Sequence, residues 1–184
     1  MKNEIKEWIR SIGIALLLGI IITSFIRGTR VYGSSMSPTL NQGDILVMFN
    51  SKKIIKGDIV IIDTDLEIKP EDLRELNPIS KLKIGKTKKL VKRVIATEGD
   101  NLVIKNGKVF LNGHELKENY INSKETFGDL RIERVPVDKL FVMGDNRENS
   151  LDSRDRRVSL VDVDDVMGKA ILRLYPFSKL GVIK

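Results

Sequence analysis

Residues 90–96, LVKRVIA, form an apolar run that two adjacent cations interrupt. Because side chains alternate between the two faces of a strand, Lys92 shares a face with Leu90 and Val94. Arg93 lies on the opposite face, which is equally apolar. The run therefore predicts a strand that is buried on both faces, with at least one of its two cations half-buried.

Other short runs rich in valine and isoleucine follow Thr29 and also predict strands. They occupy residues 45–49, 59–62, 102–104, 109–111, 140–143 and 170–175. Asn106-Gly107 separates two of these runs and predicts a type I′ hairpin turn, and Asn112-Gly113 marks the next turn. We expect a mainly β fold, a single domain of coiled antiparallel β-sheets over residues 28–184, with a polar loop insertion at 63–89.

The N-terminal segment has a different character. Sixteen residues without a charge, 11–26, lie between Arg10 and Arg27, and Trp8 precedes them at a position suited to lipid headgroups. With its flanks the run approaches the roughly 20 residues of a membrane-spanning helix. A buried core helix and a cleaved signal peptide are alternatives, but no small-residue cleavage site follows the run. We expect one N-terminal transmembrane helix at 11–27.

Basic residues set the expected orientation of this helix. Lys2, Lys6 and Arg10 precede the apolar run, whereas Arg27 and Arg30 follow it. This slight bias favours a cytoplasmic N-terminus at residues 1–10 and an extracytoplasmic β-rich domain.

Composition narrows the chemistry. The 184 residues include no cysteine, which excludes disulfides, thiolate zinc sites and cysteine proteases. The one histidine, His114, is too few for a multi-histidine metal site, and a Ser-His-Asp triad would have to use it. The net charge of +7 suits an anionic membrane surface, although a merely soluble basic surface has the same balance. The lysine-rich stretch 81–89 has no interleaved aromatic residue, so we expect no nucleic-acid partner.

Residues 32–40, YGSSMSPTL, place three serines on a turn bounded by glycine and proline. Nucleophilic hydroxyls favour tight turns, because the side chain protrudes and backbone N–H groups can meet a developing oxyanion. An ordinary polar loop has the same composition. Burial of Lys92 would lower its pKa and let it accept a proton from such a serine, as in Ser-Lys dyads. An edge-strand lysine that reaches solvent is the competing interpretation.

Residues 144–154, GDNRENSLDSR, follow a predicted strand and alternate acids with arginines. They are suited either to an ion network that fixes a nearby site or to a solvated turn.

Together these segments resemble type I signal peptidases, the bacterial leader peptidase family of Ser-Lys proteases, in a compact Gram-positive-like form. The family pattern S-M-x-P-T-L matches residues 35–40, and K-R-V with a downstream G-D matches 92–94 and 99–100. The pattern G-D-N-R-x-x-S-x-D-S-R matches residues 144–154 at every fixed position. The ending at 174–177 is similar to the family's W-P-F, with tyrosine in place of tryptophan.

The resemblance implies roles that spacing could not assign. Ser35 would be the nucleophile and its N–H an oxyanion donor, Lys92 the general base, and Ser150 a hydrogen-bond partner that orients Lys92. Supporting ion pairs would come from Arg93, Asp145, Asp152 and Arg154. Small substrate pockets would be lined by Gly33, Met36, Leu40, Leu90 and Val91. Some members place a serine where Gly33 stands, so the second oxyanion donor is unassigned. No metal or cofactor is implied.

The implied function is removal of N-terminal signal peptides from exported preproteins, with cleavage after small residues in Ala-x-Ala-like sites. The expected surroundings are the bacterial cell membrane and its lipid bilayer, near the secretion translocon. Three alternatives are open at this point: a repressor-type self-cleaving Ser-Lys protease, a related assembly factor for surface proteins, and a membrane-anchored binding module.

Overall fold

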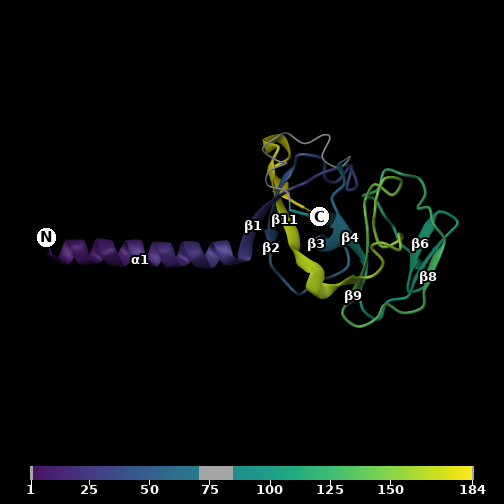
Figure 1. Cartoon of the computed structure of the whole chain (residues 1–184), viewed down its shortest axis with the longest axis horizontal. Coiled ribbons are helices and arrows are strands. Elements are labelled where there is room, and N and C mark those ends of the chain that lie inside the picture. Colours follow the sequence, from purple (N-terminus) through teal and green to yellow (C-terminus); the bar gives the residue numbers. More distant parts are fainter. Residues whose placement is uncertain (1, 71–84, 184) are drawn as a thin grey trace.

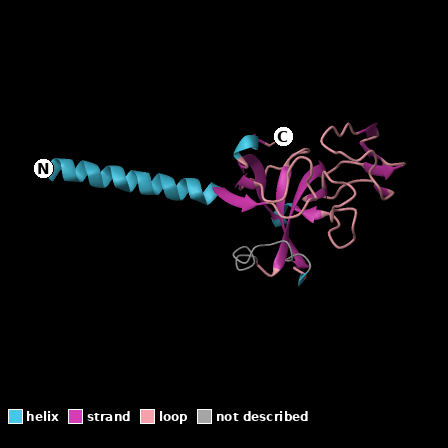
Figure 2. Ribbon diagram, turned by 90° about the horizontal axis from the view of Figure 1, so that it is seen from above, coloured by secondary structure: helices cyan, strands magenta, loops and turns pink. Residues whose placement is uncertain are grey.

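The computed structural model describes residues 2–70 and 85–183. One long helix, α1 (Lys2–Phe25), projects from a β-rich body as a separate rod (Figures 1 and 2). In these described ranges no helix combines the length and the hydropathy needed to cross a bilayer. Of the expected anchor, the structure shows a single N-terminal helix.

The larger sheet has eight antiparallel strands in the order β1-β2-β11-β3-β4-β9-β10, with β12 paired to β11. The strand that carries the two cations, β4, lies between β3 and β9 and is therefore central. The eight strands are β1 (Ile26–Arg30), β2 (Ile45–Phe49), β3 (Ile59–Glu67), β4 (Thr87–Ala96), β9 (Lys139–Met143), β10 (Val161–Asp162), β11 (Val166–Tyr175) and β12 (Gly181–Val182). Two short 3₁₀ helices, η2 (Val163–Asp165) and η3 (Phe177–Lys179), flank β11.

The smaller sheet has the order β7-β6-β5-β8 and lies beyond β9, away from α1 (Figure 1). Its strands are β5 (Leu102–Lys105), β6 (Lys108–Leu111), β7 (His114–Glu115) and β8 (Leu130–Ile132). Asn106 and Gly107 have φ values of 50° and 75°, the left-handed pair that a type I′ turn requires. Asn112 and Gly113 repeat this geometry, so both turn predictions are confirmed.

Three apolar clusters form the core. The first lies under the turn that carries the three serines, residues 32–40, which we call the serine turn. It joins Met36 and Leu40 to β2 and β3. A second fills the space between the smaller sheet and β9, and a third packs Val94 against β3 and β11. A register shift between Val94 and Ala96 ends the strict alternation of β4, so Ile95 and Ala96 both enter the second cluster.

The predicted loop at 63–89 is partly wrong. Asp63 pairs with Lys89 and Glu67 with Thr87, so both ends of the segment continue β3 and β4 as a two-stranded extension. The β3 residues of this extension are charged or polar and only partly buried, so they lack the apolar pattern that predicts a strand. The middle of the predicted loop, residues 71–84, lies outside the described residues.

Candidate active site

Ser35, on the turn formed by residues 32–40, and Lys92, on β4, come together in space. Lys92 Nζ lies 2.7 Å from Ser35 Oγ and donates a hydrogen bond to it. Because β4 is central, the Lys92 side chain is only 2% exposed, whereas Ser35 at the serine turn (residues 32–40) is half-buried. The separation lies within the range that direct proton transfer between hydroxyl and amine requires.

Burial is the main influence on the charge of Lys92. It lowers the pKa of the Lys92 amine from 10.5 to about 8, while the negative charges of Asp152 and Asp145 oppose the shift and Arg154 assists it. A lysine with this pKa is partly neutral near physiological pH and can act as a base.

The polar loop, residues 144–154, fastens the serine turn from the other side. Asn146 N–H donates to the Ser35 carbonyl at 3.0 Å, and Asn146 Nδ2 donates to the Ser34 carbonyl at 3.2 Å. Asn149 Nδ2 donates to Ser34 Oγ at 2.9 Å. The backbone around Ser35 is thus held by amide groups of the polar loop.

Gly144 makes this close approach possible. A Cβ added there would clash with the Ser35 carbonyl oxygen and with Ser150 Oγ. Any larger residue would push the serine turn and the polar loop apart.

The four residues of the expected ion network form two separate pairs. Arg93 donates to Asp145 from Nε at 2.8 Å and from Nη2 at 2.7 Å, and both side chains are buried. Thr39 Oγ1 also donates to Asp145, at 2.5 Å, which links this pair to the serine turn.

Arg154 pairs with Asp152 in the same bidentate way, at 2.9 Å from Nε and from Nη2. Burial alone would raise the pKa of Asp152, but the hydrogen bonds and charge of Arg154 outweigh it and hold that pKa below its usual range. Gly144 N–H also donates to Asp152, at 2.9 Å.

Ser150 differs from expectation. Its Oγ is buried and makes no hydrogen bond to Lys92; it lies near Asp152 and helps to lower the pKa of that carboxyl. The side chain packs against Gly144, and Lys92 directs its amine to Ser35 instead.

The expected pocket residues also divide. Met36 and Leu40 are 1% and 0% exposed in the first apolar cluster, so they support the serine turn and leave almost no surface for a substrate. Leu90 and Val91 are half-buried, and Gly33 is exposed with a φ of 76°.

Two arginines that sequence reasoning left without a role also hold this region. Arg173 of β11 donates to the Thr39 carbonyl at 2.6 Å and pairs with Asp44 at 3.3 Å, so it supports the end of the serine turn. Arg147 of the polar loop is fully buried and pairs with Glu118. The one sequence feature that pointed to Arg147 was its position in the matched family pattern. No sequence feature pointed to Glu118.

The described parts of the chain contain no group of three or more histidine, aspartate and glutamate side chains arranged to hold a metal ion. The groups gathered at the site are a hydroxyl, a buried amine and two ion pairs. A hydroxyl beside a neutral amine can act as a nucleophile on a carbonyl carbon.

Comparison with known proteins agrees with this chemistry. The family described as "Signal peptidase, peptidase S26" matches residues 5–175. The chain is 33% identical to signal peptidase I of Bacillus licheniformis, over 97% of this chain and 93% of that protein. It is 34% identical to signal peptidase I P of Bacillus subtilis subsp. natto, over 100% and 95%, and 31% identical to signal peptidase IB of Staphylococcus aureus strain COL, over 97% and 94%. This chain therefore belongs to the S26 signal peptidase family.

Proposed function

We propose that this protein is a serine endopeptidase that removes N-terminal signal peptides from exported preproteins, with Ser35 as nucleophile and Lys92 as general base. Neutral Lys92 takes the proton of Ser35 Oγ while the oxygen attacks the scissile carbonyl. The Ser35 N–H stabilises the oxyanion of the tetrahedral intermediate. Lys92 then returns the proton to the leaving amine, and an acyl-enzyme remains. The amine product is the mature chain, and the acyl group on Ser35 is the signal peptide. Water, deprotonated by Lys92, attacks the acyl carbonyl, the ester bond to Ser35 Oγ breaks, and Lys92 returns the proton to Ser35 while the signal peptide leaves as a carboxylate.

The observation that carries this proposal is the 2.7 Å contact between Lys92 Nζ and Ser35 Oγ in a site where Lys92 is 2% exposed. Burial explains why the amine can be neutral, and the contact explains why Ser35, rather than its neighbours Ser34 and Ser37, is activated.

The substrate is an extended segment that aligns beside the serine turn through main-chain hydrogen bonds. Gly33 has no side chain to obstruct such a segment, and the half-buried Leu90 and Val91 offer apolar contacts suited to small residues before the cut. An Ala-x-Ala-like preference before the cut is part of this proposal and is what the family resemblance implies.

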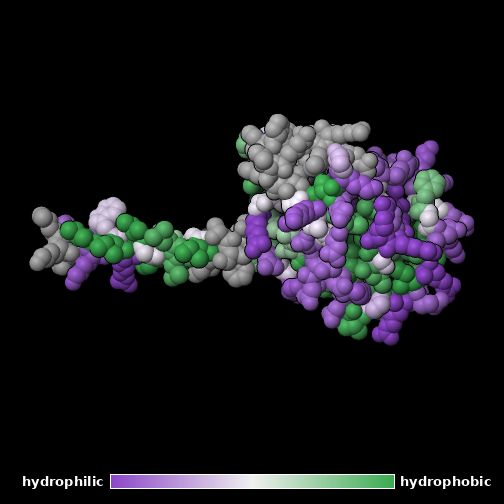
Figure 3. Space-filling model, viewed as in Figure 1, coloured by the Kyte–Doolittle hydropathy of each residue, from purple (hydrophilic) through white to green (hydrophobic). Residues whose placement is uncertain are grey.

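We further propose that α1 holds the enzyme at the bacterial membrane, with the N-terminus cytoplasmic and the β-rich domain extracytoplasmic. Figure 3 shows apolar residues along the projecting rod. Among them, Trp8 is 71% exposed, Leu16 64% and Leu17 58%. Apolar area of this kind gains free energy by leaving water. Anchoring would confine enzyme and preprotein to one plane near the translocon and raise their effective concentration.

Membrane attachment is tested by expressing the full chain and fractionating the cells after alkaline extraction. The wild type is expected in the membrane pellet. A variant with Leu16→Lys and Leu17→Lys is expected in the soluble fraction, because charges at the centre of a membrane segment cost about 3 kcal/mol each. Recovery of the wild type in the soluble fraction would contradict the proposal.

The catalytic proposal is tested by incubating the purified enzyme in detergent with a labelled preprotein. Ser35→Ala and Lys92→Ala are expected to abolish cleavage. Ser37→Ala, on the same turn, is the matched control and should retain it, because Ser37 Oγ makes only a 3.5 Å contact with Asn41. Full activity in either dyad variant would exclude this mechanism, and an inactive wild type would favour a binding module.

A further inference from the structure

The loop between β7 and β8, residues 116–129, reaches from the smaller sheet to the polar loop, and we call it the cap loop. None of the family motifs of this chain lies within the cap loop. Its side chains nonetheless contact the same loop that holds Ser35 in place.

One buried guanidinium joins the two loops. Arg147 donates from Nε to the Gly144 carbonyl at 3.0 Å, and its side chain is fully buried. Its Nη1 donates to Glu118 at 2.7 Å and to Thr126 Oγ1 at 2.6 Å, and its Nη2 donates to the other oxygen of Glu118. Glu118 therefore grips Arg147 with both carboxylate oxygens, and Arg147 holds the backbone at Gly144.

Tyr120 adds a second contact. Its ring centroid lies 4.1 Å from Arg93 Cζ and 6.0 Å from Arg147 Cζ, so the ring is close to both buried guanidinium groups. Its hydroxyl donates to Glu118 at 2.7 Å. Burial first, and then the negative charge of Glu118, raise the pKa of Tyr120, which keeps the hydroxyl protonated as a donor.

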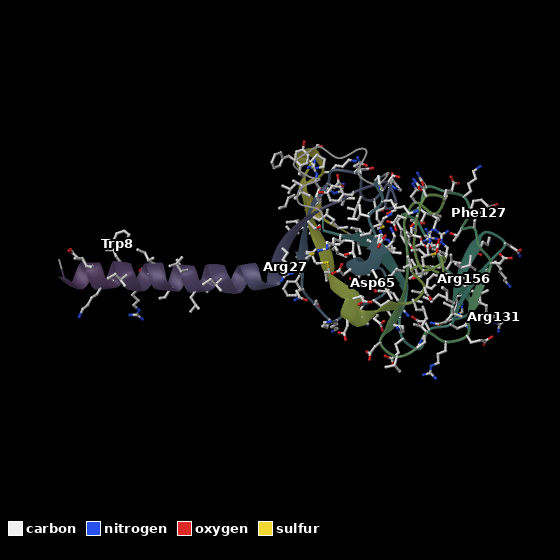
Figure 4. All side chains as sticks on the ribbon, in the orientation of Figure 1. Trp8, Arg27, Asp65, Phe127, Arg131 and Arg156 are labelled. Atoms are coloured by element: carbon white, nitrogen blue, oxygen red, sulfur yellow. The ribbon has the colours of Figure 1, made fainter. Side chains whose placement is uncertain are left out.

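A third contact lies at the other end of the cap loop. Arg154 donates to the Phe127 carbonyl at 3.3 Å and to the Arg147 carbonyl at 2.9 Å. Figure 4 places Phe127 on the side of the molecule that carries the smaller sheet. The cap loop is thus fixed to both ion pairs that flank Lys92.

We infer that Glu118 is a positioning residue for the proposed cleavage reaction, acting through Arg147 and Gly144 on the Ser35 backbone. Gly144 packs against the Ser35 carbonyl so closely that even a Cβ would not fit, so a shift of Gly144 must shift the nucleophile. Without Glu118, Arg147 would be a buried cation with no bonded carboxylate, and the polar loop would move to hydrate it. Displacements of about 1 Å at a reacting atom lower rates by up to about 10²-fold.

The test is steady-state cleavage of a preprotein by full-length Glu118→Gln, with Glu115→Gln as matched control. Glu115 lies three residues before Glu118, on β7, and pairs with Lys108 at 2.9 Å, but both side chains are more than half exposed. We expect kcat per folded molecule to fall about 10- to 100-fold in Glu118→Gln, with KM within about twofold of the wild type. Glu118→Asp, which keeps the carboxylate, should recover part of that kcat.

Near-UV circular dichroism gives the folded fraction for each variant. If the loss in Glu118→Gln equals its loss of folded protein, or if Glu115→Gln falls as far, the inference is overturned. If Glu118→Gln does not fold, the variant Tyr120→Phe provides the test. It removes only the hydroxyl that donates to Glu118, so we expect kcat to fall about threefold. An unchanged kcat in Tyr120→Phe would overturn the inference. The inference rests on the proposed function, and an inactive wild-type enzyme would refute the inference and the proposed function together. If the wild type, the Glu115→Gln control and Glu118→Gln are all fully active, only the inference is refuted.

Discussion

The two sides of β4 each bury one cation, and the two cations have different partners. On one face of β4, Lys92 is 2% exposed and contacts a hydroxyl, Ser35 Oγ, at 2.7 Å. On the other face, Arg93 is 3% exposed and bonds the Asp145 carboxylate twice. Burial disfavours the charge of a lysine that bonds only a hydroxyl, whereas a guanidinium stays charged and its carboxylate partner compensates the cost of burying it.

The largest expected effect comes from giving the Lys92 site a cation that keeps its charge. Lys92→Arg retains a positive side chain, but a guanidinium does not deprotonate in proteins and cannot serve as base. We expect preprotein cleavage to fall by about 10³-fold or more. Lys89→Arg, the same change at an exposed position on β4, should leave cleavage unchanged. Substantial activity in Lys92→Arg would mean that the base lies elsewhere.

The next effect concerns stability on the other side of the strand. Arg93→Met leaves Asp145 buried without its bidentate partner, and removing one member of a buried ion pair costs about 3–5 kcal/mol. Urea denaturation followed by circular dichroism measures this loss. A matched comparison is Lys52→Met, which removes the partner of the exposed Asp164 and should leave the midpoint unchanged. If Arg93→Met is as stable as the wild type, the pairing with Asp145 has no structural role.

A smaller effect of opposite sign is expected from Lys92→Met. Burial disfavours the charged form of Lys92, so its pKa falls from the ordinary lysine value of 10.5 to about 8 in the folded protein. The unfolded chain binds more protons between these two values, and the destabilising contribution of Lys92 is therefore complete below pH 8 and disappears as the pH rises towards 10.5. At pH 7, Lys92→Met should gain about 1–3 kcal/mol while losing activity.

Denaturation of Lys92→Met and the wild type at pH 7 and at pH 10 checks this sign. The gain should shrink at the higher pH. A destabilised Lys92→Met at pH 7 would show that Lys92 is held by compensating charges, as Arg93 is.

The sequence anticipated elements whose signals are local. The run 45–49 became β2 with the same bounds, and Asn106-Gly107 formed the expected turn. Strand β1, IRGTR, has no apolar alternation and exists because β2 supplies its hydrogen-bond partners. The two-stranded extension of β3 and β4 was missed for the same reason, since pairing across the ladder outweighs the polar composition of each strand.

Residue identity selected the candidate dyad, whereas packing determines the features of the site that the sequence did not predict. Motif resemblance selected Ser35 and Lys92, which are 57 positions apart, and geometry brings them together. The burial of Met36 and the absence of a Ser150–Lys92 hydrogen bond depend on how the serine turn packs against the polar loop. The Glu118–Arg147 pair spans 29 positions and two loops, so no local pattern announces it.

The mildest effect expected is a pH dependence that distinguishes the two cations without any mutation. Only the neutral form of Lys92 can accept the Ser35 proton, so kcat/KM should rise about tenfold per pH unit below the Lys92 pKa of about 8 and level off above it. Cleavage at pH 7 should then be about one tenth of the plateau.

The variant Arg154→Gln tests this pH dependence further. The positive charge of Arg154 helps to lower the Lys92 pKa, and Arg154 also pairs with Asp152, whose negative charge raises the Lys92 pKa. Removing that arginine should therefore move the inflection to higher pH, and preprotein cleavage measured from pH 6 to 10 in both proteins reads the shift. An inflection near 10.5, the ordinary lysine pKa, in the wild type would mean that burial does not disfavour the charge of Lys92, and the contrast with Arg93 would lose its basis.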